Sequence, residues 1–231
     1  MQWPLLESLP TDDRARILDS ARRRHFKRGE TVFHEGDEGD SLHLVETGTF
    51  AVQVSAPAGE RATINVLSPG DFFGELSLLQ RPQSSQTPRR SATVFALAPA
   101  QTLALAGSAF TALRNAHPSV EHLVVAALAH RVEQLSNRLL EALYIGVDRR
   151  VYLRLIELAE IYRKPPSDTV IPLSQGDLAT MAGASRPTVN QVLQKLVSRA
   201  IVSLDRRQIT ILDLPALRAA APDVGPPAWD R

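Results

Sequence analysis

The spacing of apolar and polar positions divides the chain into regions of different secondary structure. Residues 1–20 show helical spacing, with Thr11, Asp12 and Asp13 as a helix start. From Arg23 to about Leu105 short strand-like runs are separated by Gly and Pro. These runs are residues 31–34, 42–45, 50–54, 63–67, 92–97 and 102–106. Many short strands at this spacing predict a jelly roll or barrel.

Helical periodicity returns at Ser108 and continues to Arg163, with a break at Gly146 and Asp148 as the expected cap of the next helix. Within it, six residues alternate steps of three and four. They are Val125, Leu128, Val132, Leu135, Leu139 and Ala142, and we call them the seam. A seam of this kind predicts a parallel helix pair between two subunits. A helix packed on its own barrel is the alternative, because the repeat is shorter than three to four heptads.

Residues 173–196 contain two short helices joined by a tight turn. Ser174 and Asp177 form a capping signature, Gly183 supplies the turn, and Ser185 starts the second helix. Ala179 is a small residue where the second helix would cross the first. This pattern predicts a helix-turn-helix.

The second of these helices has two distinct faces. Its apolar stripe is Val189, Val192, Leu193, Leu196 and Val197. Its outward positions are Arg186, Pro187, Asn190, Gln191 and Gln194. Exposed Arg, Asn and Gln side chains can read base edges in a major groove. An ordinary solvated helix is the alternative interpretation.

Two strand-like segments, residues 201–204 and 208–212, flank Asp205, Arg206 and Arg207. They predict a hairpin with a basic tip, and so a winged helix with phosphate contacts. Residues 165–168 are expected to form a turn, and residues 221–231 a disordered tail. The candidate DNA-binding residues are Ser174, Ser185, Arg186, Pro187, Thr188, Asn190, Gln191, Lys195, Arg206 and Arg207.

Composition narrows the classes of protein. The chain has 231 residues, enough for two domains, and a formal net charge of +1, so a nucleic-acid surface must be a local patch. The absence of cysteine excludes disulfides, thiolate zinc sites and a cysteine nucleophile. No apolar run reaches the ~18 residues of a membrane span, so we expect a cytoplasmic protein without a membrane partner.

Residues 27–52, followed by the run PGDFFGEL that ends at Leu76, resemble the cyclic-nucleotide-binding domain. Together with the long helix and the winged helix, residues 5–218 resemble the family of the cyclic-AMP receptor protein and the fumarate–nitrate regulator (CRP/FNR). The resemblance implies an α+β fold with an N-terminal jelly roll (double-stranded β-helix), a dimerisation helix and a C-terminal winged helix-turn-helix. The expected bounds are 1–117 for the sensor domain, 118–145 for the dimerisation helix and 146–220 for the DNA-binding domain.

The resemblance also implies a function. Members of the family are homodimeric transcriptional regulators, not enzymes. They bind an inverted-repeat operator in double-stranded DNA and act with RNA polymerase. Pro187 and Gln191 depart from the family's base-reading pattern, so we expect this operator to differ from that of the cyclic-AMP receptor protein.

The family's pocket motif appears as Gly-Glu-Leu and Arg-Ser-Ala. By the resemblance, Arg90 would pair with a cyclic phosphate, Ser91 would donate a hydrogen bond to it and Glu75 would accept one from the ribose. The implied ligand-binding residues are Gly74, Glu75, Leu76, Arg90, Ser91, Ala92 and Ser136. Cyclic AMP or another cyclic nucleotide is the implied effector, and no other cofactor is indicated.

Two departures from the family leave alternatives open. Extra loop-like residues within 80–89 separate Glu75 from Arg90, so Arg89 could take the place of Arg90. Leu135-Ser136 stands where cyclic-AMP responders have Thr-Ser, which weakens recognition of adenine. The alternatives are a structural Glu75–Arg90 ion pair without a ligand and a regulator that binds DNA constitutively.

The histidines and acidic residues suggest two further candidate functions. His34, the acids at 35, 37, 38 and 40, and His43 would suit a metal-dependent jelly-roll enzyme, although the spacing fits a turn better. A haem-based gas sensor would use a histidine as the haem ligand. The candidates are His25, His43, His117, His122 and His130.

Overall fold

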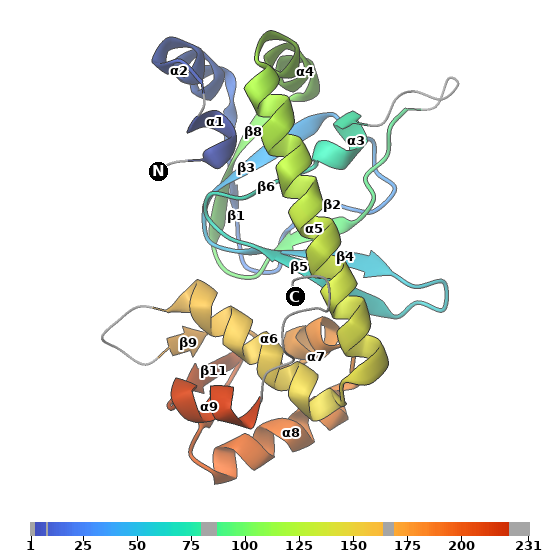
Figure 1. Cartoon of the computed structure of the whole chain (residues 1–231), viewed down its shortest axis with the longest axis vertical. Helices are drawn as coiled ribbons and strands as arrows, with labels where there is room; N and C mark the ends of the chain where they lie inside the picture. Colours follow the sequence, from blue (N-terminus) through green and yellow to red (C-terminus); the bar gives the residue numbers. More distant parts are fainter. Residues whose placement is uncertain (1–2, 8, 80–86, 164–168, 222–231) are drawn as a thin grey trace, which may run out of the picture. The chain divides into compact units, whose positions relative to one another are not determined.

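The computed structural model describes residues 3–7, 9–79, 87–163 and 169–221 (Figure 1). The chain forms two compact units, Met1–Asn137 and Arg138–Arg231, and the division falls inside helix α5. The expected turn at 165–168, most of the 80–89 insertion and residues 222–231 of the expected tail lie outside the described residues.

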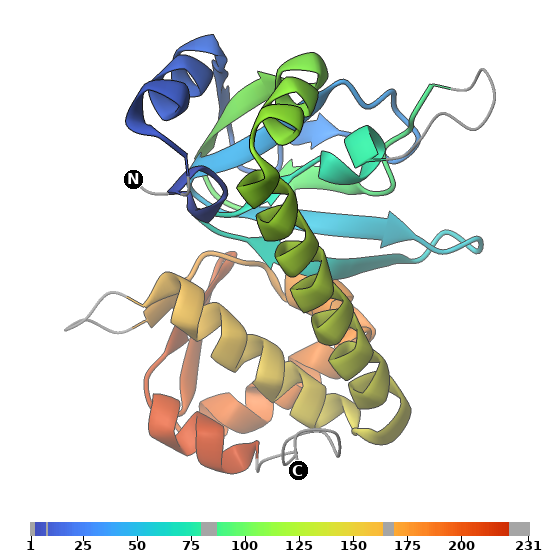
Figure 2. The ribbon, with the colours of Figure 1, turned by 45° about the horizontal axis from the view of Figure 1, so that its top comes forward.

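The strands of the first unit form two antiparallel sheets, ordered β1-β8-β3-β6 and β2-β7-β4-β5 (Figures 1 and 2). Their bounds are β1 Arg22–Phe26, β2 Thr31–Phe33, β3 Ser41–Thr47, β4 Phe50–Ser55, β5 Arg61–Leu67, β6 Phe72–Phe73, β7 Thr93–Ala96 and β8 Ala100–Ala106. Side chains from both sheets share one buried cluster, which includes Phe26, Val45, Phe50 and Val94. The predicted jelly roll is confirmed.

Two of these strands were missed by the sequence pattern. Strand β1 reads RRRHF, and only Phe26 in it is buried, so it has no apolar alternation to detect. It forms because its backbone pairs with β8 along the full length of the strand, from Arg22 opposite Ala104 to Phe26 opposite Ala100. Strand β6 has only two residues and cannot show a period.

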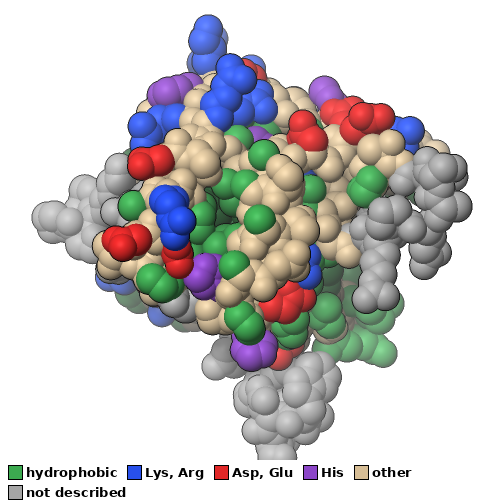
Figure 3. Space-filling view, turned by 90° about the horizontal axis from the view of Figure 1, so that it is seen from above, with side chains coloured by type: hydrophobic (Ala, Val, Ile, Leu, Met, Phe, Trp, Pro, Cys, Tyr) green, Lys and Arg blue, Asp and Glu red, His purple; other side chains and the backbone are tan. Residues whose placement is uncertain are grey.

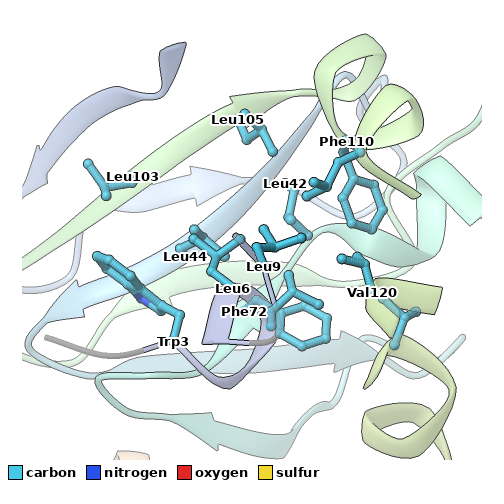
Figure 4. Packing of buried hydrophobic residues seen from close by; sticks show 13 residues of the cluster. Trp3, Leu6, Leu9, Leu42, Leu44, Phe72, Leu103, Leu105, Phe110 and Val120 are labelled. Carbon is cyan, nitrogen blue, oxygen red and sulfur yellow. The ribbon is translucent and has the colours of Figure 1, made fainter. Parts of the chain in front are cut away.

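Helices cover the outer face of the sheet that contains β3 and β8. They are α1 Pro4–Glu7, α2 Thr11–Ser20, α4 Gly107–Ala116 and the first part of α5 Pro118–Tyr144, while α3 Glu75–Leu79 follows β6. Trp3, Leu6 and Leu9 pack with Leu42, Leu44, Phe72, Leu103, Leu105, Phe110 and Val120 (Figure 4). Trp3 Nε1 also donates a hydrogen bond to Val45 O at 2.9 Å. Each such burial of a large apolar side chain contributes roughly 1.5–3 kcal/mol.

The expected single helix over residues 1–20 is two helices. Helix α2 begins at Thr11 as predicted, but Pro10 precedes it with an extended backbone, ψ 146°. A proline restricts the residue before it to extended conformations, so α1 ends before Pro10. The chain can then turn and bury Leu5 and Leu6.

Helix α5 is only partly a free surface. Val120 and Val124 are buried, and Leu128 packs half-buried against the same cluster. The other seam residues, Val125, Val132, Leu135, Leu139 and Ala142, are exposed. Leu128 therefore packs on its own barrel. The alternative interpretation had expected this packing for the whole helix.

In the second unit, α6 and α8 pack against a small sheet ordered β10-β11-β9, while α7 and α9 pack on α6. The bounds are α6 Val147–Tyr162, β9 Thr169–Ile171, α7 Gln175–Ala182, α8 Arg186–Ser198, β10 Val202–Asp205, β11 Gln208–Ile211 and α9 Leu214–Ala220. The predicted hairpin is β10 with β11, whereas β9 is recognisable only from its pairing with β11. Gly146, not Asp148, is the N-cap of α6, and Asp148 instead accepts a hydrogen bond from Lys195 Nζ at 2.7 Å.

Charge is distributed unevenly over the surface. In the view of Figure 3, several Lys and Arg side chains gather toward the upper left, with acidic side chains beside them and elsewhere on this face. Among the described helices, none combines the length and the apolar character needed to cross a membrane.

Candidate functional site

A cavity of about 500 Å³ lies within the first unit, between the β-sandwich and the α5 residues from Leu128 to Leu135. Most of its lining is apolar, with Phe33, Val52 and Leu67 among the residues of the sheets. Six of the predicted ligand-binding residues line it, although they come from two segments of the chain. They are Gly74, Glu75, Leu76, Arg90, Ser91 and Ala92.

Arg90 is the buried cation of this cavity. Only 5% of its surface is exposed. Its Nη1 donates to Ser41 O at 2.8 Å, to Gly74 O at 3.0 Å and to Ser77 Oγ at 3.2 Å, and its Nη2 donates to Ser41 Oγ at 3.1 Å. Its Nε is also buried but has no hydrogen-bond partner among the described residues. An unpaired buried donor is costly, and the described residues supply no acceptor for this N–H.

Gly74 is required for this arrangement. Its φ is +89°, a backbone conformation that L side chains rarely adopt. A Cβ at this position would lie 2.6 Å from Arg90 Nη1 and 2.8 Å from Ser41 O. A larger residue would therefore push the guanidinium out of its place.

Glu75 opens helix α3 and is almost fully buried. Its carboxylate pairs with the guanidinium of Arg131 from α5, and Arg131 Nη2 also donates to Phe72 O at 2.6 Å. The alternative of a Glu75–Arg90 ion pair is therefore wrong for this structure. Burial raises the pKa of the Glu75 carboxyl above its ordinary value, while the nearby charge of Arg131 opposes that rise.

Arg131 is a pocket residue that sequence reasoning missed. It lies three positions after Leu128 and four before Leu135, so all three share one helical face. That spacing could have revealed it. The pattern alone, however, does not show that the face turns toward a carboxylate on α3.

Two other expectations are resolved by side-chain positions. Arg89 is exposed, and its Nη1 donates to Gly36 O at 2.7 Å, so Arg90 and not Arg89 faces the cavity. Ser136 does not line the cavity, because its exposed hydroxyl donates to Val132 O at 2.9 Å within the same helix. Leu135, beside it, is a lining residue.

The second unit presents the predicted helix-turn-helix. At the start of α7 Ser174 Oγ accepts from Asp177 N, and Ser174 N donates in return to Asp177 Oδ2 at 2.8 Å. Gly183 ends α7 with φ 58°. Ser185 accepts from Thr188 N at the start of α8, with Pro187 in the first turn. The hydroxyls of Ser174 and Ser185 thus make cap bonds, and their contact with DNA stays a prediction.

Helix α8 has the two faces that were predicted, with one exception. Val189, Val192, Leu193 and Leu196 are buried, but Val197 is exposed because the stripe drifts around the helix by its last turn. The outward positions Arg186, Pro187, Asn190, Gln191 and Gln194 are exposed. Lys195 is exposed as well, but its ammonium pairs with Asp148 of α6.

The tip of the β10–β11 hairpin is basic and exposed, as predicted. Asp205 pairs with Gln208 across the turn, and Arg206 and Arg207 lie between them. Arg207 has a left-handed backbone, φ 55°.

The histidines do not gather into a metal site in the described part of the chain. His43 is in the core, His117 pairs with Asp13 at 3.2 Å, and His130 lies against Gln134 on α5. No group of three or more His, Asp or Glu residues among the described positions is placed to hold an ion.

Comparison with known proteins agrees with this architecture. The cyclic nucleotide-binding domain matches residues 23–117, and the Crp-like helix-turn-helix domain matches residues 149–220. The HTH-type transcriptional regulator Cmr of Mycobacterium tuberculosis is 30% identical, over 92% of this chain and 82% of the relative. The chain belongs to the CRP/FNR family of transcriptional regulators. This CRP/FNR protein is therefore a DNA-binding regulator that carries a sensor domain of the cyclic-nucleotide-binding type.

Two further relatives extend the comparison. The cyclic AMP receptor protein of Thermus thermophilus is 29% identical to this CRP/FNR regulator, over 94% of this chain and 96% of the relative. The solved structure of CLP, described as a c-di-GMP responsive global regulator of Xanthomonas campestris, has a TM-score of 0.73 at 18% identity, over 87% of this chain and 99% of that chain. The second likeness concerns the fold alone.

Proposed function

We propose that this regulator is a homodimer that binds an inverted-repeat operator and is controlled by a cyclic nucleotide in its barrel cavity. The observation that carries the effector is the buried guanidinium of Arg90, whose free Nε–H points to an anionic ligand. A cavity of about 500 Å³ is within the usual range for small-molecule sites.

The dimer is supported by the exposed part of the seam. Val125, Val132 and Leu139 are 56%, 62% and 60% exposed, and Leu143 and Tyr144 extend the apolar surface of α5. Large apolar side chains that cluster on one helix face indicate a protein–protein contact. The same face of a second subunit would bury them, and dimerisation would place two copies of α8 in successive major grooves about 34 Å apart.

The proposed effector cavity and the proposed dimer interface share residues of α5. Leu128, Val132 and Leu135 belong to the seam and also line the cavity. A ligand held by Arg90 would therefore have its apolar part beside residues that pair the subunits. Such a ligand activates the regulator only if it binds the DNA-competent arrangement better than the other arrangement.

The relatives named above are transcriptional regulators, and we propose no catalytic activity. RNA polymerase is the expected protein partner, and the cytoplasm, where operator DNA lies, is the expected location.

A second candidate is a regulator that needs no ligand. Leu135 offers no hydrogen bond to a base and is 45% exposed on the seam, where it can tighten the subunit contact by itself. In that case the protein would bind its operator equally well with and without an effector.

One experiment separates the two candidates. An operator is selected from random duplexes, and its binding is measured with and without cyclic AMP and cyclic GMP, alongside calorimetry of each nucleotide. Cyclic-nucleotide control predicts tighter DNA binding with at least one nucleotide and loss of that effect in Arg90→Gln. The matched control is Arg89→Gln, which removes the neighbouring charge and should keep the response.

If neither nucleotide binds and operator affinity does not change, the ligand-independent candidate stands and the effector proposal fails. If no duplex is selected at all, the DNA-binding part of the proposal fails.

A further inference from the structure

One buried polar residue of the barrel has no role in the function proposed above. His43 on β3 is 1% exposed, and its ring stacks on Phe73 with centroids 5.0 Å apart and planes 10° apart. Its Nδ1 lies 3.1 Å from Thr102 Oγ1 and its Nε2 lies 3.3 Å from Ser41 Oγ. An apolar residue of similar shape would fill this place without needing two hydrogen-bond partners.

The contact with Ser41 leads toward the cavity. Ser41, which contacts His43, also holds Arg90 with two of its atoms, since its carbonyl accepts from Nη1 and its hydroxyl accepts from Nη2. A serine hydroxyl has one hydrogen to donate, and two acceptors face it, Asp40 Oδ1 at 2.9 Å and His43 Nε2. Thr102, His43, Ser41 and Arg90 thus form one connected chain of polar groups.

The protonation state of His43 suits this arrangement. Burial, with the nearby charges of Arg90 and Arg24, lowers the pKa of His43 to about 3, although Asp40 opposes the shift. The imidazole is therefore neutral near pH 7. In either neutral tautomer one ring nitrogen donates and the other accepts, so the imidazole can make a hydrogen bond with both the Ser41 and the Thr102 hydroxyl.

The aromatic ring of Phe33 contacts the same guanidinium. The carbon at the centre of the Arg90 guanidinium lies 4.1 Å from the centroid of the Phe33 ring, and Phe33 in turn contacts His43, with centroids 6.0 Å apart. His43 therefore contacts two of the residues that hold Arg90, Ser41 and Phe33. The position of the Arg90 Nε–H is fixed only while Nη1 and Nη2 of the same guanidinium are held by their acceptors.

We propose that His43 is a positioning residue that acts through Ser41 and Phe33 to aim the Arg90 guanidinium, and that it thereby sets the anion affinity of the cavity. This inference rests on the proposed function, because it takes the cavity to be the effector site. It goes further in assigning a role to a residue outside the cavity lining.

The test uses the full-length protein and two replacements of His43. His43→Phe keeps an aromatic ring against Phe73 but removes both nitrogens. His43→Gln keeps an amide that can reach Ser41 and Thr102. We expect His43→Phe to weaken binding of cyclic AMP or cyclic GMP about tenfold, which is the size of the contribution of one hydrogen bond. His43→Gln should recover most of the affinity.

A double-mutant cycle separates positioning from a general loss of structure. In an Arg90→Gln background, His43→Phe should have no further effect on binding, because the group that it positions is gone. An equal loss of affinity in both backgrounds would overturn the proposal and leave His43 as a core residue only.

A readout without ligand keeps the proposal testable if neither nucleotide binds. The Nε–H resonance of Arg90, assigned by its loss in Arg90→Gln, should exchange slowly with solvent in the natural protein and faster in His43→Phe. If neither nucleotide binds but the Arg90 Nε–H exchanges faster in His43→Phe, the cyclic-nucleotide effector is rejected and the positioning role of His43 is supported. Unchanged exchange in His43→Phe would reject the positioning role whatever the outcome for the effector.

Discussion

Arg186 is the first residue of α8, and its side chain is exposed beside Pro187 and Thr188. Its guanidinium can donate two parallel hydrogen bonds to a guanine in the major groove. The cap bond and the buried residues of α8 hold this helix in the second unit. The backbone of Arg186 is therefore fixed relative to the rest of that unit.

We expect Arg186→Ala to weaken binding to the selected operator by about 1–3 kcal/mol and to relax the preference at one base pair. Arg199→Ala, which removes the same charge at the other end of α8, should leave the base preference unchanged. Binding curves on the operator and on single-base variants would show this. Equal preference profiles for Arg186→Ala and the natural protein would remove Arg186 from base reading.

His43 makes the first unit sensitive to acid. Its folded-state pKa of about 3 is below the ordinary value of 6.5, so the unfolded chain takes up a proton that the folded protein does not. Its contribution is therefore complete above pH 6.5 and is lost as the pH falls from about 6.5 toward 3. The free energy of unfolding should drop by roughly 4 kcal/mol from this group between pH 7 and pH 3.5.

Denaturant unfolding of the natural protein and of His43→Gln, measured at several pH values, tests this. The variant has no imidazole to protonate, so the gap between the two stabilities should close as the pH is lowered. Parallel curves from pH 7 to pH 3.5 would contradict the burial of a neutral His43.

At the scale of elements, α5 serves two surfaces at once. Val120, Val124 and Leu128 pack against the barrel cluster, while Val132 and Leu139 are exposed on the seam. The face that meets the barrel also carries Arg131, whose pairing with Glu75 ties α5 to the start of α3. Helix α5 therefore connects the cavity with the surface proposed for dimerisation.

Leu139→Glu should convert the dimer to a monomer, because it places a carboxylate in the apolar contact between subunits. The side chain is exposed in the single chain, so folding of the monomer should be unaffected. Asn137→Glu, on the same helix and exposed off the seam, is the matched control and should remain dimeric. Sedimentation equilibrium gives the masses, and a dimeric Leu139→Glu variant would contradict the proposed interface.

For the molecule as a whole, DNA affinity must come from local patches, because the formal net charge is only +1. The patch that we assign to phosphate contact is the hairpin tip with Arg206 and Arg207. Each phosphate contact that is lost reduces the steepness of the salt dependence.

The Arg206→Gln/Arg207→Asn variant should bind with a shallower dependence of log affinity on log salt, by roughly 4 for a dimer that loses four phosphate contacts. Asparagine is chosen at 207 because it tolerates a left-handed backbone. Base preference should stay the same. The control Arg22→Gln/Arg28→Gln removes two exposed charges from the first unit and should keep the original slope, and a wing variant with that same slope would remove the tip from the interface.

Several features of this protein follow from the sequence by itself. The helix-turn-helix was predictable because its capping bonds, its glycine turn and its apolar stripe all join residues within one or two helical turns. The strand-like runs that alternate or are bounded by glycine were predictable for the same reason. The pocket motif was recognised from its resemblance to the family, which also identified Arg90.

Other features were decided only by the tertiary structure. Arg131 finds Glu75 across 56 positions of sequence, and Arg90 finds Ser41 across 49. Strand β1 exists because β8 pairs with it, and Leu128 is the half-buried residue of the seam because it packs against the barrel cluster. In each case the deciding contact joins residues far apart in the chain, so its partner is set by closure of the sheets and docking of α5. Local periodicity carries no information about either event.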